Sequence, residues 1–590
     1  MKDKGIDLHE IQDSHKLSPI PDMFLIDDRG QREEFRAFIK NNPYVNYDKD
    51  YYQAHTAFFS DMDLERLFTT YFETDELENP KRHNIKELFY FLPANLEVVR
   101  FRQDIVKDFI EDPLLSDVIE SSMNTLRKSL AGVNFSSTSK GLLLPYSKLI
   151  RDYEAVLVNL IEKLGAKSSE GLKQLSRFLK QMKDHPDMKV WKDYDKKIEE
   201  EVPFYLSLTR RFDFTPIAFS IFGFENDSSA LSKMLKEATD RFGKIKTDTI
   251  DGERLEAMEV NLTYRHQYVR IPLMEAFVQI MMQVFGNPFD GLENHVRYVI
   301  ASLSQLSFYR KSARLYRQLT AEGIPCIFPD VREAKARGMK IEEAYNFLIE
   351  RKRGTRLVPN DIENSYKCRI NVITGSNYGG KSCYMKTISL VQLMGQIGLY
   401  VPARSASLSV VDHIFTHFPE REGAGDIESR YSWELERAKR IFSYATPYSL
   451  VLFDEPCSGT AYTEGISQTR TFIKISQQIG MKTYFTTHMH EIAKDIEENR
   501  DVYPYCDNLF VVTEQTNQGP RYTYQILKGM ANYSGAAQLA EARGCDEVAL
   551  KKLLDGRILT NSLPVIDDSA YNGGDHSSAV GRYIPGGETG

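Results

Sequence analysis

The sequence contains no pair of cysteines at the C-x-x-C spacing that zinc sites and redox motifs use. Its six cysteines are scattered instead, at Cys326, Cys368, Cys383, Cys457, Cys506 and Cys545. Neither a cysteine zinc site nor a disulfide framework is therefore indicated, and this cysteine usage fits a reducing compartment best.

Long apolar runs are also missing. No stretch reaches the roughly 18 apolar residues that a membrane-spanning helix needs. The N-terminal residues Met1–Leu8 contain no apolar segment of signal-peptide length. We therefore predict a cytoplasmic protein without a membrane partner.

An excess of positive charge is absent as well, because 75 Lys and Arg stand against 83 Asp and Glu, which gives a net charge of -8. This balance argues against a protein whose whole surface binds nucleic acid, since neutralising phosphates needs clustered Lys and Arg. A local basic face remains open. The 590 residues, 42% of them hydrophobic and 27% charged, are enough for several globular domains.

What the sequence does contain is a glycine-rich stretch, Asn371–Ser382, between a β-branched run and a helical pattern. Gly375, Gly380, Lys381 and Ser382 fit the spacing G-x-x-x-x-G-K-[ST]. In this motif, backbone N–H groups surround a polyphosphate at the N-terminus of a helix. An ordinary glycine turn is the alternative, which the order of strand, loop and helix disfavours.

This stretch predicts ATP and Mg²⁺ as cofactors. Lys381 is expected to reach the β- and γ-phosphates, and Ser382 to place its hydroxyl on Mg²⁺. The predicted nucleotide-binding residues are Gly375, Ser376, Asn377, Tyr378, Gly379, Gly380, Lys381, Ser382 and Cys383. Apolar residues then recur on one helical face from Cys383 to about Ile397.

Two carboxylates follow a second predicted strand, Ser449–Phe453, whose continuous apolar run is typical of a buried parallel strand. We expect Asp454 to hold Mg²⁺, directly or through water, and Glu455 to orient or deprotonate the attacking water. A simple strand terminus is the alternative, and the position after a phosphate loop disfavours it.

A third strand, Lys482–Thr487, ends directly before His488. A lone histidine is more often a packing residue, but at this strand end it could hydrogen-bond the γ-phosphate or the catalytic water. We predict a structural role for His490, which lies two residues further on.

Helical periodicity dominates the sequence before the phosphate loop, over about 83–130, 145–200 and 253–319. A shorter pattern predicts a helix over Tyr51–Phe72, for which we assign no chemical task. The apolar run Phe214–Phe224 is compatible with a strand or a loop.

The last of these helices carries four basic residues beside aromatic ones, namely Arg310, Lys311, Arg314 and Arg317. Interleaved basic and aromatic side chains could grip a nucleic-acid backbone. A solvated helix face with the aromatic rings buried is the more common interpretation.

Several segments, taken in order, resemble the MutS DNA mismatch-repair family. The run Thr374–Lys386 is similar to the family's phosphate loop, and Asp426–Leu435 is similar to its signature loop. Asp454–Thr460 and Thr487–Ile492 resemble the acid-pair and switch-histidine segments. The resemblance extends over about residues 357 to 555, and the helices upstream resemble the family's core and lever.

This resemblance implies an α/β P-loop ATPase domain of the ABC-related type that follows a mainly α-helical core and lever domain. It also implies a homodimer with composite ATP sites, in which Ser429 acts on the ATP of the partner subunit and joins Glu455 and His488 as a catalytic residue. Leu357 stands near the position where the family often stacks an aromatic ring on adenine.

The predicted domains are an N-terminal segment without an assigned role (1–82), the helical core and lever (83–345), the ATPase domain (346–558) and a disordered tail (559–590). A clamp-like insertion in the helical domain is left open. The core resemblance begins near residue 85, which leaves no room for both the mismatch-reading and the connector domain. Phe109–Glu111 matches the mismatch-reading tripeptide, but lies inside a predicted core helix.

The function that these features predict is an ATP-dependent DNA-binding protein, a dimeric clamp on mismatched or structurally irregular DNA, with a MutL-like factor as a further partner. The alternative is an ATP-gated scaffold that acts on the ribosome, RNA or a protein partner without a DNA role. A nucleoside or metabolite kinase is disfavoured by Glu455 and by the signature loop.

Overall fold

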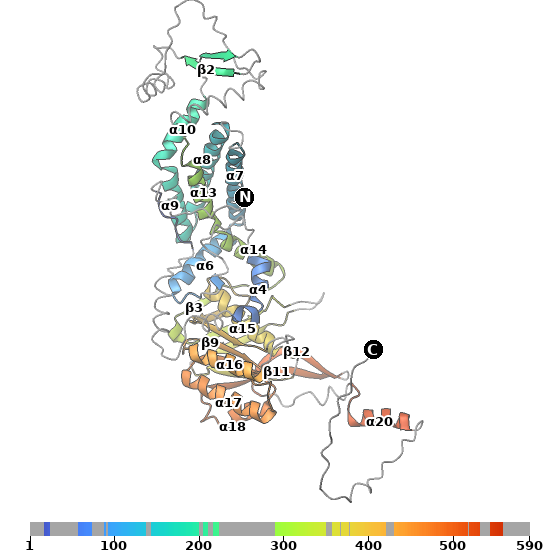
Figure 1. Cartoon of the computed structure of the whole chain (residues 1–590). Helices are drawn as coiled ribbons and strands as arrows, with labels where there is room; N and C mark the ends of the chain where they lie inside the picture. The colour runs from blue at the N-terminus through green and yellow to red at the C-terminus, as the bar shows by residue number, and fades with distance from the viewer. Residues whose placement is uncertain are drawn as a thin grey trace, which may run out of the picture.

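The computed structural model describes residues 17–23, 57–72, 88–89, 92–136, 143–199, 205–210, 216–222, 289–349, 357–365, 367–376, 378–419, 430–516, 519–530 and 543–558. In these residues a column of helices stands on an α/β part (Figure 1). The predicted tail, 559–590, lies outside the described residues.

A six-stranded sheet forms the centre of the α/β part, in the order β12-β11-β6-β10-β9-β8. The strands are β6 (Ile370–Thr374), β8 (Ile414–His417), β9 (Leu450–Asp454), β10 (Lys482–Thr487), β11 (Cys506–Thr516) and β12 (Gly519–Lys528). All neighbours are parallel except β11 and β12, which pair antiparallel. The C-terminal ends of β6, β9 and β10 therefore meet at one edge of the sheet.

Helices cover both faces of this sheet. They are α15 (Lys381–Gln396) on one face and α16 (Arg430–Tyr444), α17 (Tyr462–Ile479) and α18 (His490–Glu498) on the other (Figure 1). Because side chains alternate along a strand, Leu452 of β9 joins the core on the α15 side while Phe453 joins the core of the other three helices. Burial on both faces explains the apolar run of β9 and confirms the predicted buried strand.

Helix α15 confirms the helix predicted after the phosphate loop, but its burial is not limited to one face. Every residue from Thr387 to Gln396 is buried. The amide of Gln396 donates to Pro93 O and to Val411 O, and its Oε1 accepts from Val411 N. These bonds satisfy a polar side chain in the core, where an unpaired amide would cost about 1–3 kcal/mol.

A second sheet of four strands lies beside the first, in the order β3-β7-β4-β5. Its strands are β3 (Asp330–Arg332), β4 (Met339–Ala344), β5 (Asn360–Asn364) and β7 (Ser405–Ser409). Residues on both sides of the predicted boundary at 345/346 thus contribute to one sheet.

The helical column consists of α6 (Leu96–Glu111), α7 (Pro113–Ser136), α8 (Leu143–Gly165), α9 (Glu170–Lys183), α10 (Pro186–Glu199), α13 (Leu292–Ser304) and α14 (Ser307–Ala321). The predicted helical patterns are confirmed in these ranges. Phe109 of α6 is fully buried, as expected of a core position. Asp108 is buried as well, because its carboxylate accepts bonds from Ser168 N and Ser169 N at the start of α9.

The ambiguous apolar run contains a strand. β2 (Pro216–Phe222) pairs antiparallel with β1 (Tyr205–Arg210), and Pro216 stands at its first residue, where a missing N–H is tolerated. The rest of the predicted helical region before α13, residues 253–288, lies outside the described residues.

Hydrogen bonds from side chains to backbone carbonyls connect the helical column with the α/β part. Arg102 of α6 donates to Ile397 O at the end of α15, over 3.4 Å. Tyr400 donates its hydroxyl to Ser312 O of α14, over 2.8 Å. One hydrophobic core runs through both parts and includes residues of α15 as well as residues of the helical column.

The N-terminal segment also contacts the α/β part. It contains α4 (Leu64–Leu67) and a π-helix (Phe68–Phe72), and Leu64 and Leu67 are buried as the helical pattern predicts. Asp61 forms an ion pair with Arg437 of α16 and accepts a hydrogen bond from Thr416. The start of the predicted helix, residues 51–56, lies outside the described residues.

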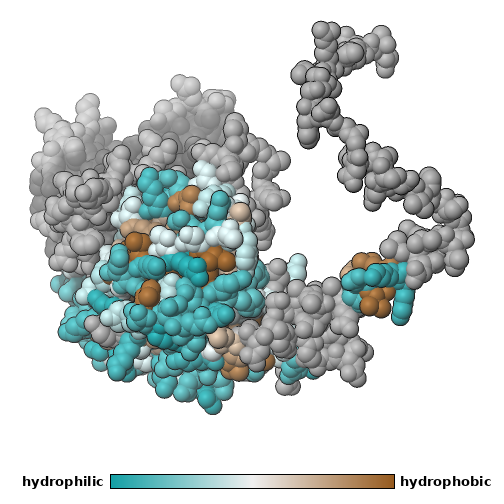
Figure 2. Space-filling view, turned by 90° about the horizontal axis from the view of Figure 1, so that it is seen from below, coloured by the Kyte–Doolittle hydropathy of each residue, from teal (hydrophilic) through white to brown (hydrophobic). Residues whose placement is uncertain are grey.

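In the described part of the chain, no helix combines the length and the apolar composition that crossing a bilayer requires. The face seen from below, where α17 and α18 lie, is mostly hydrophilic with small separate hydrophobic spots (Figure 2). The last described helix, α20 (Glu547–Ile558), exposes Val548 and Leu553.

A buried lysine at the start of β10 is expected to make stability depend on pH. Lys482 donates to Ser409 Oγ over 2.7 Å and is 2% exposed, and burial lowers its pKa to about 8. The unfolded chain keeps this proton up to a pH near 10.5, so between pH 8 and 10.5 it binds more protons than the folded chain. We expect the free energy of unfolding to rise in this window by about 1 kcal/mol per pH unit from this residue.

The measurement is urea unfolding of the natural protein and of Lys482→Met at several pH values from 7 to 11. The difference between their unfolding free energies should shift in favour of the natural protein as pH rises through the window. Lys494→Met, which removes an exposed lysine of α18, is the matched control. Equal slopes for all three proteins would contradict the prediction.

Candidate functional site

The phosphate-loop motif lies between β6 and α15, at the edge where the parallel strands end. Gly380 is the N-cap of α15 with a φ of 98°, which a glycine adopts without strain. A Cβ on Gly375 would lie 2.9 Å from Val511 Cβ, and one on Gly379 would lie 2.8 Å from Val511 Cγ1. The loop therefore requires glycine at both places to sit against β11. Asn377, predicted within this loop, lies outside the described residues.

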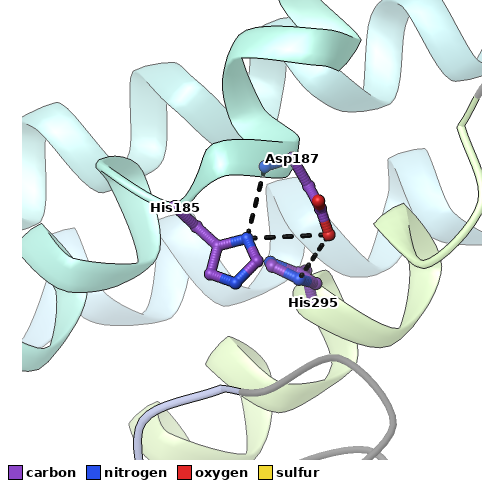
Figure 3. A group of neighbouring side chains, drawn as sticks. All are labelled: His185, Asp187 and His295. Carbon is purple, nitrogen blue, oxygen red and sulfur yellow. Dashed lines mark hydrogen bonds and ion pairs between the residues drawn. The ribbon is translucent and has the colours of Figure 1, made fainter.

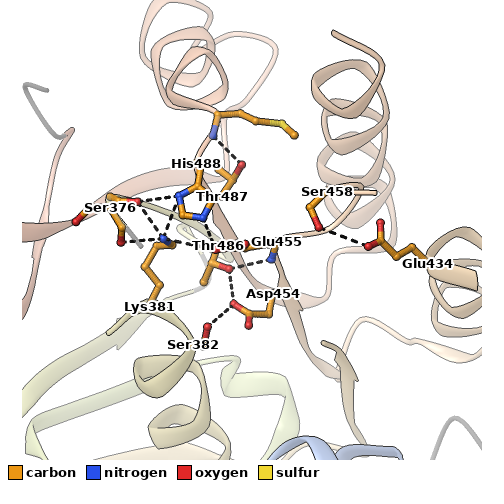
Figure 4. A network of polar contacts seen from close by, with 12 residues as sticks. Ser376, Lys381, Ser382, Glu434, Asp454, Glu455, Ser458, Thr486, Thr487 and His488 are labelled. Carbon is orange, nitrogen blue, oxygen red and sulfur yellow. Dashed lines mark hydrogen bonds and ion pairs between the residues drawn. The ribbon is translucent and has the colours of Figure 1, made fainter. Parts of the chain in front are cut away.

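Lys381 occupies the centre of the site and is 4% exposed. Its ammonium group donates to Gly375 O over 2.9 Å and to Ser376 O over 3.2 Å (Figure 4). Glu455 Oε1 lies 3.6 Å away. Burial lowers the pKa of Lys381, while the negative charges of Glu455 and Asp454 act in the opposite direction.

Asp454 at the end of β9 and Ser382 in the first turn of α15 form an oxygen-rich pair. Ser382 Oγ donates to Asp454 Oδ1 over 3.0 Å, and Thr486 Oγ1 donates to the same oxygen over 2.5 Å (Figure 4). Burial raises the pKa of Asp454 despite these bonds. A carboxylate and a hydroxyl in a buried site are ligands that Mg²⁺ accepts, so the donor set fits this ion.

Glu455 follows in a strained backbone conformation, with a φ of 47°. Its Oε1 lies 2.5 Å from His488 Nε2 (Figure 4). Burial raises the pKa of Glu455, but the hydrogen bond with His488 and the charges of His488 and Lys381 bring it below its ordinary value. The side chain is therefore a carboxylate at neutral pH, the form that can accept a proton.

His488 links the acid pair to the loop. Its Nδ1 lies 3.2 Å from Gly375 O and 3.3 Å from Lys381 Nζ. Three of the predicted site residues, Lys381, Glu455 and His488, thus meet within one group of contacts. Lys381 begins α15, and Glu455 and His488 directly follow β9 and β10.

Two residues of this site were not predicted from the sequence. Thr486 donates to Asp454, and its hydroxyl accepts from Glu455 N over 3.0 Å, so it holds both acids. Tyr524 of β12 places its ring against the loop, since a Cβ on Gly380 would lie 3.4 Å from Tyr524 Cδ1. Tyr524 as a whole residue is 49% exposed. Only the polar end of β10 could have indicated Thr486, and no sequence signal indicated Tyr524.

The other predicted residues take no part in this group of contacts. Ser429 is outside the described residues, which resume at Arg430 with α16. Cys383 lies in the first turn of α15, where burial raises the pKa of its thiol to about 11 and keeps it protonated at neutral pH. Tyr378 is almost fully exposed, and Leu357 packs against the hydrophobic core.

Helix α16 approaches the acid pair from the other side. Glu434 is 2% exposed, and its carboxylate accepts from Ser458 Oγ over 3.5 Å and from Gly459 N over 3.4 Å (Figure 4). The segment that follows the acid pair is thus attached to the helix that follows the predicted signature loop.

The basic residues of α14 are used partly within the protein. Arg310 forms an ion pair with Glu120 of α7, and Arg317 donates to Phe109 O. Phe308 and Tyr309 are buried. Arg314 is exposed. This arrangement matches the interpretation of a helix face with buried aromatic rings rather than a free basic stripe.

The fold and the site define an α/β domain with a glycine loop at the carboxyl edge of its parallel strands. Residues 371–553 match the family model described as MutS domain V. The DNA mismatch repair protein MutS of Lactococcus lactis subsp. cremoris is 33% identical over 268 residues, which are 45% of this chain and 31% of that protein.

The DNA mismatch repair protein MutS of Streptococcus sanguinis is 30% identical over 321 residues, 53% of this chain and 34% of that protein. That of Synechococcus sp. is 32% identical over 218 residues, 37% of this chain and 24% of that protein. The C-terminal part of this chain is therefore similar to MutS proteins, which confirms the resemblance there. The chain spans about a third or less of the length of these curated relatives.

Proposed function

We propose that this protein is a cytoplasmic ATPase of the MutS type that binds mismatched or structurally irregular DNA as a dimeric clamp. The observation that carries the proposal is the convergence of Lys381, Asp454 and Glu455 beside the glycine loop of a MutS domain V. The proposed architecture is a P-loop, ABC-related ATPase domain (346–558) that follows a helical core and lever (83–345).

The site residues have separable tasks in this proposal. The N-terminus of α15 and the loop from Gly375 to Cys383 bind the phosphates of ATP, and Lys381 neutralises their charge. Ser382 and Asp454 would hold Mg²⁺, which when bound stabilises negative charge on the phosphates. Tyr524 offers an aromatic surface on which the adenine base of ATP can stack. The position near which the family often has such an aromatic residue is occupied here by Leu357.

Hydrolysis is assigned to Glu455, assisted by His488. Glu455 is a carboxylate whose oxygen lies between a lysine and a histidine, so it can orient a water and accept its proton. Thr486 and His488 fix the positions of the two acids, Asp454 and Glu455. Ser429 of the partner subunit is proposed to complete each ATP site of a homodimer.

Helix α15 offers a route from ATP to the helical column. It begins in the loop with Lys381 and ends where Arg102 of α6 donates to Ile397 O. Because α15 is buried from Thr387 to Gln396, we expect it to move as a rigid body in a packed environment. Nucleotide binding at its N-terminus is thereby proposed to shift the levers between two arrangements that grip DNA differently.

The alternative, an ATP-gated scaffold for the ribosome, RNA or a protein partner, is favoured by one observation. Arg310 and Arg317 are engaged inside the protein, so α14 presents less basic surface to DNA than its sequence suggests. A MutL-like factor remains a proposed partner under the DNA-binding function.

The decisive experiment measures two activities of the full chain at a fixed salt concentration. ATP hydrolysis is followed with Mg²⁺ and with EDTA, and fluorescence anisotropy reports binding to matched, mismatched and branched duplexes and to structured RNA, each with ATP, ADP or no nucleotide. We expect Mg²⁺-dependent hydrolysis and a nucleotide-dependent preference of about tenfold or more for one DNA shape, roughly 1.4 kcal/mol.

Each half of the proposal can fail separately. Hydrolysis without DNA binding in any nucleotide state would replace the clamp with the scaffold. Binding of structured RNA in preference to every duplex would point to the same alternative. Absence of Mg²⁺-dependent ATP hydrolysis would contradict the ATPase assignment itself.

A further inference from the structure

A group of two histidines and one aspartate lies in the helical column, far from the nucleotide site. His185 occupies the turn between α9 and α10, Asp187 lies in the first turn of α10, and His295 lies in the first turn of α13 (Figure 3). Among the residues that the structure describes, this is the one group of three or more His, Cys, Asp or Glu side chains placed to hold a metal ion.

The donor atoms are nearly close enough to share an ion. Asp187 Oδ2 lies 3.6 Å from His185 Nδ1 and 3.8 Å from His295 Nε2. One ligand atom from each residue lies within 4.8 Å of the others. Ligands at about 2.0–2.2 Å from a tetrahedral Zn²⁺ are about 3.3 Å apart, so movements of a few tenths of an ångström to about 1.5 Å bring the group to that geometry.

The surroundings hold the rings in place. His295 has no exposed surface, and the rings of Trp191 and His185 each contact it edge-on with centroids 4.8 Å away. Asp187 is 40% exposed, so water has access to the side of the group that its carboxylate occupies. Three fixed donors with a solvent-accessible side match a site in which water supplies the fourth ligand.

The alternative to a metal site is that these side chains only stabilise the fold. His185 Nδ1 accepts a hydrogen bond from Asp187 N over 3.3 Å and so caps the start of α10. The cap explains the position of His185 but not that of His295, which belongs to a distant segment and faces the same carboxylate oxygen (Figure 3). A metal ion would take over the nitrogen that the cap uses.

We propose that His185, Asp187 and His295 form a binding site for one divalent transition-metal ion of the Zn²⁺ class. Two imidazole nitrogens and a carboxylate oxygen are a donor set that suits zinc, cobalt and nickel better than Mg²⁺ or Ca²⁺. The ion ties the start of α10 to the start of α13. The two segments that it would join, the turn before α10 and the first turn of α13, are about 100 residues apart in the sequence.

Trp191 provides a built-in reporter. The sequence has two tryptophans, so Trp433→Phe leaves Trp191 as the only one. Co²⁺ takes the same ligands as Zn²⁺ and quenches tryptophan fluorescence at short range. We expect Co²⁺, added to this variant in excess Mg²⁺, to quench the fluorescence with saturation at one equivalent, and Zn²⁺ to restore it by displacement.

Asp187→Asn in the same background should weaken Co²⁺ binding by about tenfold or more. Loss of a residue that only hydrogen-bonds a metal ligand already lowers metal affinity by about this factor, and loss of the ligand itself should lower it at least as much. Asp193→Asn is the matched control, because it removes the same charge from an exposed position of α10. Zn²⁺ should also raise the midpoint of thermal unfolding of the control variant and not that of Asp187→Asn.

The proposal is overturned by quenching that does not saturate, or by equal quenching in Asp187→Asn and Asp193→Asn. Either result would reduce the group to a helix cap with packed rings. Neither readout depends on ATP or DNA, so the outcome is independent of the proposed function.

Discussion

Glu455→Gln is expected to lower the rate of ATP hydrolysis by about 100-fold to 10,000-fold, the range that a positioned general base contributes. Glutamine keeps the size of the side chain and its capacity to hydrogen-bond His488, but it cannot accept a proton. ATP affinity should stay within about a factor of two, because the phosphates are bound by the loop and Lys381 rather than by this carboxylate. Single-turnover hydrolysis and equilibrium binding of a fluorescent ATP analogue measure the two quantities.

The backbone of residue 455 makes the choice of glutamine important. Its φ of 47° is strained for any residue except glycine. A substitution that keeps the shape of the side chain leaves this turn intact, so a lower rate can be attributed to the lost proton acceptor. Glu498→Gln changes an exposed carboxylate of α18 in the same way and serves as the control. If Glu455→Gln hydrolysed ATP as fast as this control, another residue would have to be the base.

Lys381→Met is expected to weaken ATP binding itself, by about 100-fold or more. The lysine is the buried cation that offsets Asp454 and Glu455, so its loss leaves two carboxylates facing the phosphates. Hydrogen bonds that involve charged groups contribute about 1.5–3 kcal/mol each, and 1.4 kcal/mol corresponds to a factor of ten. Isothermal titration with ATP and Mg²⁺ measures the effect directly.

Lys386→Met is the matched control for this second variant. Lys386 lies one turn further along α15 and forms an ion pair with Asp63 over 2.5 Å, outside the loop. Its loss should leave ATP affinity unchanged, whereas circular dichroism should show that both variants are folded. Equal ATP affinity of Lys381→Met and Lys386→Met would mean that the loop does not bind the nucleotide phosphates.

Lys381→Met and Glu455→Gln separate ATP binding from hydrolysis. The sequence alone could only suggest that different residues serve these two steps. Lys381 and Glu455 were predicted from two separate patterns, a glycine spacing and a strand that ends in acids. In the structure their side chains lie 3.6 Å apart, because β6 and β9 run parallel on either side of β10. Parallel strands bring their carboxyl ends to one edge, so a pattern at each strand end was sufficient to predict a shared site.

Residues whose contacts are distant in the sequence could not be predicted from such local patterns. Thr486 is one of several threonines in β10, and only the pairing with β9 in register with Asp454 selects it. Arg102 and Asp108 are charged residues of α6, yet both are buried because the end of α15 and the start of α9 supply hydrogen-bond partners. Periodicity describes one helix and contains no information about what packs against it.

The sequence by itself determined the elements whose signal is local. These are the glycine loop between strand and helix, the apolar strand before the acid pair, the helical column and the resemblance of the C-terminal part to the MutS family. Only the tertiary structure decided that Arg310 and Arg317 are engaged within the protein, that Tyr524 faces the loop, and that His295 meets the turn before α10. The physical reason is that turn chemistry and periodicity act over a few residues, whereas these contacts depend on how separate segments pack around one core.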